Sequence, residues 1–120
     1  MKSSIDGTTY AKAQLAARME SNQTAIAKFA KIMADPTACR LYALTWASDI
    51  FKQTAEFEVA QSVLHSLNEN FPIEDIRDNL TSTALNIARY IPQSTSPTSN
   101  LAEQYKAAAC LEIMNDIRRI

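Results

Sequence analysis

The chain has 120 residues and carries 12 Lys and Arg against 13 Asp and Glu, which leaves a formal net charge of −1. Its length predicts one domain that can bury a modest core without metal or disulfide support. The near-zero net charge argues against a surface that is strongly charged overall. The charge is uneven, however, at about +3 over residues 1–34 and about −5 over residues 35–80. These two segments could dock on each other within or between chains, but two ordinary solvated faces are the favoured interpretation.

Glycine occurs only once, at Gly7. Hairpins and phosphate-binding loops need Gly because it readily adopts positive φ, so the sequence has little turn chemistry of that kind. Good helix formers fill the long segments instead. We therefore predict one all-α domain, a helical bundle of about four helices over residues 9–34, 36–68, 72–91 and 100–119, two of them long.

The first helix follows residues 1–9, which are small and polar and which we expect to be frayed. Its apolar positions recur at spacings of four and three residues once one polar position is included. This pattern is typical of a helical packing seam. The seam consists of Leu15, Met19, Asn22, Ile26, Phe29 and Met33.

Residues 21–24, Ser-Asn-Gln-Thr, interrupt this helix with four polar side chains. Ser21 or Asn22 could cap a new helix. Neither Pro nor Gly is present, however, and the apolar stripe keeps its phase across the stretch. We therefore favour one continuous helix with Asn22 on the seam, where a single polar residue fixes register and oligomeric state at a cost in stability.

The second helix is predicted to start at Asp35 and Pro36, a good N-cap followed by a good first helical residue. It continues to about residue 68 without another Pro or a Gly. Most of its circumference is apolar, and the charged strip is narrow, comprising Asp49, Lys52 and Glu56. A helix of this kind is expected to be central in its fold.

Two further helices are predicted in the second half of the chain. Pro72 begins residues 72–91, with acidic residues in the positive first turn of the helix. Residues 92–99 are rich in Ser, Thr and Pro and are expected to form a flexible connection. Asn100 and Glu103 then match a capping box that starts the last helix.

The two long helices are expected to extend beyond a compact body. A helix of some 30 residues spans about 45 Å, whereas a compact domain of this size has a radius of gyration near 14 Å. The part that extends beyond the body would expose its apolar stripe. We therefore expect a homodimer, or a partner protein that covers this stripe.

No residue pattern in the sequence indicates catalysis. The chain has one His and two cysteines far apart, and it lacks a phosphate loop, a dinucleotide motif and a zinc-type cluster. We therefore predict a protein that is not an enzyme and has no metal or cofactor. Without an N-terminal apolar signal segment or an apolar run of membrane length, the expected location is the cytoplasm, with reduced thiols and no membrane partner.

Three functional hypotheses fit these features. The favoured one is a small helical protein–protein interaction module (an adaptor, regulator or assembly factor) that self-associates through the seam. The second is a bundle that binds a small apolar ligand in a cavity lined by Tyr42, Trp46, Ile50 and Phe57. The third is a nucleic-acid accessory protein that uses the basic residues of the first helix, although nucleic acid is the less expected partner because those residues are few.

Overall fold

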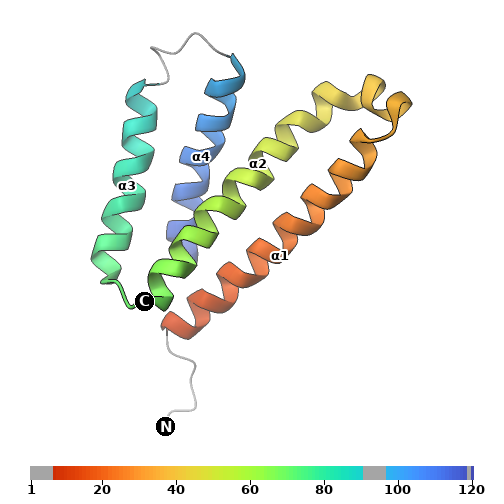
Figure 1. Cartoon of the computed structure of the whole chain (residues 1–120). Helices are drawn as coiled ribbons and strands as arrows, with labels where there is room; N and C mark the ends of the chain where they lie inside the picture. The colour runs from red at the N-terminus through yellow and green to blue at the C-terminus, as the bar shows by residue number, and fades with distance from the viewer. Residues whose placement is uncertain (1–6, 91–96, 119) are drawn as a thin grey trace.

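The chain forms an all-α bundle in the computed structural model, which describes residues 7–90, 97–118 and 120 (Figure 1). Side chains are described at these positions except 38–39, 41–47 and 97–99. The described residues form four helices: α1 (Gly7–Met33), α2 (Pro36–Asn68), α3 (Ile73–Tyr90) and α4 (Pro97–Asp116). The predicted fold class is confirmed.

The ends of the helices agree with the prediction for α2 and differ at α1 and α4. α1 begins at Gly7, so residues 7–9 are helical rather than frayed, and residues 1–6 lie outside the described part. α4 begins at Pro97, since a first helical residue needs no N–H partner. Residues 97–99 therefore belong to the helix rather than to a flexible connection, residues 92–96 are not described, and Asn100 lies inside α4 rather than at its cap.

The junction between α1 and α2 follows the predicted capping. The side chain of Asp35 accepts a hydrogen bond from the backbone N–H of Thr37 at 2.9 Å. This bond satisfies one of the N–H groups that a helix leaves without a partner in its first turn. Asp35 is therefore the N-cap of α2, and Pro36 is its first residue.

The turn between α2 and α3 uses Asn where many proteins use Gly. Asn70 has a φ of 62°, in the left-handed region. The N–H of Phe71 donates to the carbonyl of Ser66, and the N–H of Asn70 donates to the carbonyl of Leu67. These two bonds define a Schellman motif, and Asn tolerates its left-handed position better than most residues. The chain thus makes a tight helical turn without Gly.

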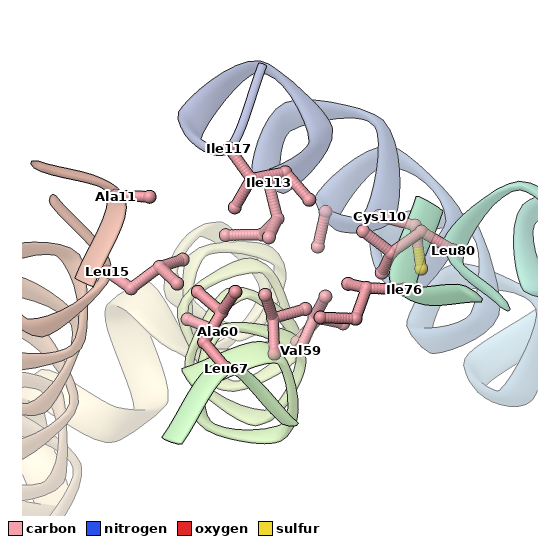
Figure 2. Close-up of a cluster of buried hydrophobic side chains, with 13 residues drawn as sticks. Ala11, Leu15, Val59, Ala60, Leu67, Ile76, Leu80, Cys110, Ile113 and Ile117 are labelled. Carbon is pink, nitrogen blue, oxygen red and sulfur yellow. The ribbon is translucent and has the colours of Figure 1, made fainter. Parts of the chain in front are cut away.

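The core lies where parts of all four helices meet (Figure 2). α2 and α4 face each other across it, with α1 and α3 on opposite sides. α2 packs extensively on α1 and α4, and α3 packs mainly on α4. The core residues are Ala11 and Leu15 of α1, Ala55, Val59, Ala60, Val63 and Leu67 of α2, Ile76 and Leu80 of α3, and Ala109, Cys110, Ile113 and Ile117 of α4 and the C-terminal turn.

The molecule is elongated because α1 and α2 extend past α3 and α4. Its radius of gyration is 16.5 Å, against about 14 Å for a compact domain of this size. Residues 23–33 of α1 and 36–54 of α2 contribute no described residue to the core. We call this pair of segments the α1–α2 arm (Figure 1). The expected overhang of the two long helices is present.

The left-handed turn predicts how substitutions at Asn70 affect stability. Asn70→Gly should leave stability unchanged or raise it, because Gly adopts positive φ without a steric penalty. Asn70→Ala should lower the free energy of unfolding by about 1 kcal/mol, because Ala keeps the Cβ penalty of the left-handed conformation but loses the polar side chain whose local hydrogen bonding lets Asn tolerate it. Urea unfolding followed by circular dichroism measures both changes. Equal stability of the Gly and Ala variants would contradict the assigned turn.

Candidate interaction site

The predicted seam is one face of a continuous α1, so residues 21–24 do not break the helix. Leu15 and Asn22 are buried within the single chain, at 0% and 2% exposure. Met19, Ile26, Phe29 and Met33 are half-buried. The seam faces α2 of the same chain, and its role in self-association stays a prediction for these four half-buried residues.

Burial along this seam falls from one end of α1 to the other. Ala11 and Leu15 are fully buried where both α2 and α4 lie nearby. Ile26, Phe29 and Met33 remain half-buried in the arm, where α1 runs beside α2 past the ends of α3 and α4 (Figure 1). The same apolar stripe is therefore covered completely at one end and partly at the other.

A cluster of charged side chains lies at the end of the buried part of the seam. The Arg18 guanidinium contacts carboxylates from two other helices: Asp116 at 2.7 Å, Glu56 at 3.2 Å and Glu112 at 3.4 Å. The hydrogen bond to Asp116 is the main cause that raises the pKa of Arg18 above its usual value, although burial opposes it. Arg18 therefore stays charged and links α1 to both α2 and α4.

Asn22 extends this cluster toward the arm. Its Nδ2 donates to Gln53 Oε1 at 2.6 Å and to Glu56 Oε1 at 3.2 Å. Its Oδ1 is buried and has no hydrogen-bond partner. The amide orientation is fixed by the Glu56 carboxylate, which requires a donor. Asn22 thus sets the register between α1 and α2 inside one chain. We call Arg18, Asn22, Gln53, Glu56, Glu112 and Asp116 the Arg18 cluster.

The sequence pattern indicates only some of the contacts in the Arg18 cluster. Glu56 was expected on a narrow charged strip, yet it is buried because Arg18 and Asn22 bind its carboxylate. The available signal was the opposite charge of residues 1–34 and 35–80, which allows docking between them but is more often a pair of solvated faces. Arg18 with Glu56 confirms one such contact within the chain. Arg18 is correspondingly less available to nucleic acid than the exposed Lys28 and Lys31.

Two of the four residues of the predicted ligand cavity, Tyr42 and Trp46, have side chains outside the described ones. Ile50 and Phe57 are half-buried. A groove of about 540 Å³ lies elsewhere, between α2, α3 and α4, and includes neither residue. We call it the α2–α3 groove.

The α2–α3 groove has an apolar floor and a polar rim. Val59, Val63, Ile76 and Leu80 form the floor together with Cys110. The rim residues are Glu58, Ser62 and Ser66 of α2, Asp75, Asn79 and Thr83 of α3, Lys106 of α4, and Phe71 of the turn. Phe71 is 54% exposed at one end, held by the Schellman motif.

Two leucines lie exposed on the opposite side of α3 and α4. Thr81 Oγ1 lies 3.6 Å from Met114 Sδ, which marks where the two antiparallel helices meet near the surface. Leu85 is one turn further along α3, and Leu111 is one turn back along α4. They are 53% and 57% exposed. This face offers positions for matched control substitutions away from the arm.

No protein-family model, curated protein or solved structure matches this chain. Among the described residues, no helix is long and apolar enough to cross a membrane. That same part of the chain holds no group of three His, Cys, Asp or Glu residues suited to a metal ion. The function is therefore argued from the arm, the Arg18 cluster and the groove.

The Arg18 cluster predicts unequal costs for two substitutions in α1. Arg18→Met should lower the free energy of unfolding by about 2–3 kcal/mol, because it leaves the buried Glu56 carboxylate without its cation. Asn22→Leu should change it by less than about 1 kcal/mol, since it also removes an unsatisfied buried oxygen. Chemical unfolding measures both. Lys12→Met is the charge-matched control, and a similar loss in Lys12→Met and Arg18→Met would contradict this assignment.

The buried thiol in the groove floor predicts a pH effect. Burial raises the pKa of Cys110 above its usual value of 9.0, partly offset by the charge of Lys106. The folded state therefore holds the thiol proton more tightly than the unfolded state, and this stabilisation is present below pH 9 and lost as pH rises further.

Burial should also slow the chemistry of this thiol. In a Cys39→Ser background, the native Cys110 thiol should react with a disulfide reagent at least about tenfold more slowly than the unfolded one. An alkaline fall in stability that persists in Cys110→Ala would contradict the assignment to this thiol.

Proposed function

We propose that this chain is a non-enzymatic helical interaction module that self-associates through the α1–α2 arm and acts as an adaptor, regulator or assembly factor. The observation that carries the proposal is the loss of burial along one seam. Leu15 is fully covered, whereas Ile26, Phe29 and Met33 are only half-buried. An apolar stripe that continues past its covering helices favours a further helix as its partner.

A second copy of the chain would cover the half-buried apolar stripe of the arm better than a small ligand would. The half-buried residues extend over two turns of α1 and face one neighbouring helix. Two arms that pack against each other would form a four-helix arrangement, which is the usual way to bury two-helix hairpins. The arm meets the Arg18 cluster at Gln53 and contains no core residue, so this pairing leaves the monomer core intact.

Self-association can be tested by the solution mass of the protein over a range of concentrations. The wild type should approach twice the mass of one chain in multi-angle light scattering. Phe29→Gln should shift the protein toward monomer by at least about tenfold in dissociation constant, because it removes an apolar side chain near the centre of the interface. Circular dichroism checks that the variant remains helical.

Leu85→Gln is the control, because it places the same polar side chain at an apolar position of α3, 53% exposed, rather than in the arm. Hydrogen exchange of wild-type residues 23–33 should slow as concentration rises, which needs no substitution. A wild type that is monomeric at all concentrations would refute the proposal. A dimer that Leu85→Gln disrupts and Phe29→Gln does not would refute the arm as interface.

A further inference from the structure

The α2–α3 groove occupies a place where two antiparallel helices would normally pack directly. α2 and α3 are joined by residues 69–72 only, yet they touch each other little and both pack on α4. The groove residues Glu58, Val59, Ser62, Val63 and Ser66 form one stripe of α2 at helical spacing. The groove residues Asp75, Ile76, Asn79, Leu80 and Thr83 form the facing stripe of α3. The two faces that should meet across the hairpin are therefore separated by an open channel.

The length and the open rim of this channel suit a short helix. Each wall covers nine residues, Glu58 to Ser66 and Asp75 to Thr83, which corresponds to about 12 Å or two helical turns. The groove is open to solvent along its rim rather than enclosed. Its apolar floor can accept side chains that recur at i, i+3, i+4 and i+7, the pattern used by helices that bind in grooves.

Charge on the rim selects the kind of helix. Glu58 and Asp75 are exposed and lie on opposite walls, toward opposite ends of the groove. Glu74 and Asp78 add negative charge on α3 beside it. Lys106 is the one cation among the described lining residues. A helix with Lys or Arg on both flanks of its apolar stripe complements this surface, and an acidic helix is repelled by it.

We infer that the α2–α3 groove binds one basic amphipathic helix from a partner protein. Its apolar stripe lies on Val59, Val63 and Leu80, and Phe71 contacts its first turn. Its basic flanks pair with Glu58 and Asp75. This inference is independent of self-association, because the groove shares no residue with the arm.

The two ends of the groove also fix the direction of the bound helix. The antiparallel register places Ser66 beside Asp75 near the turn, and Glu58 beside Thr83 at the other end, where Lys106 lies. Lys106 offsets Glu58 at its end, so the net negative charge lies at the Asp75 end, and the positive N-terminus of the guest helix lies there. Basic residues in the last turn of the guest then reach Glu58.

Synthetic peptides test the inference on the full chain. One peptide of about 15 residues carries Leu at i, i+3, i+4 and i+7 with Lys on both flanks, and a matched peptide carries Glu in place of Lys. Fluorescence anisotropy should show one-to-one binding of the Lys peptide and at least about tenfold weaker binding of the Glu peptide. Equal binding of the two peptides, or no binding of either, would overturn the inference.

Variants at the rim place the binding in the groove. Ser62→Arg should weaken binding of the Lys peptide at least about tenfold, because it fills the channel from an exposed position without disturbing the floor. Gln61→Arg adds the same charge to the neighbouring exposed position, which does not line the groove, and should change binding less than about twofold. Equal effects of the two substitutions would place the peptide elsewhere and overturn the assignment.

Substitutions of Glu58 and Asp75 and a small-molecule probe provide two further tests. Glu58→Gln with Asp75→Asn should weaken the Lys peptide about three- to tenfold and reduce its salt dependence, whereas Glu69→Gln should not. If dodecanoate binds and Ser62→Arg blocks it while neither peptide binds, the groove is a small-ligand site and the inference fails. Light scattering of Ser62→Arg should match wild type, so failure here is distinguishable from failure of self-association.

Discussion

The mismatch in helix length is the constraint on which the rest of the structure depends. α1 and α2 have 27 and 33 residues, whereas α3 and α4 have 18 and 20. At about 1.5 Å per residue, the first pair is longer than the second by some 10–20 Å. The core can form only where all four helices are present. The excess becomes the arm, where Ile26, Phe29 and Met33 are half-buried rather than buried.

The Arg18 cluster lies at the boundary that this mismatch creates. On its core side, Leu15 is fully buried and Met19 is half-buried against the apolar core; on its other side, α1 continues into the arm. A buried ion pair contributes little net stability because desolvation of both charges offsets their attraction. Its stronger effect is specificity, since a slip of α1 against α2 would leave Glu56 buried without Arg18 or Asn22. The cluster therefore fixes the register from which the arm extends.

The two proposed surfaces differ in physical character and need not compete. The arm presents a half-buried apolar stripe, which suits a copy of the same stripe. The groove has a floor that is already nearly buried and a rim that is acidic and polar, so charge contributes more to the choice of partner there. Because the groove is formed by the second half of α2 and the arm by its first half, one chain can hold a second copy and a foreign helix together.

Local sequence features predicted the four helices and the apolar stripe of α1, although not where α1 and α4 begin. The single Gly, the capping by Asp35 and Pro36, and the unbroken stripe across Asn22 are local features, and they predicted an all-α fold, α2 over residues 36–68 and a continuous α1. Only the tertiary structure showed that Leu15 and Asn22 are covered within the chain, because one seam pattern serves equally for packing within a chain and between chains. It also decided that Glu56 is buried, since an ionic partner 38 residues away in sequence leaves no periodic signal. The groove was likewise beyond sequence reasoning, because it depends on how α4 separates α2 from α3.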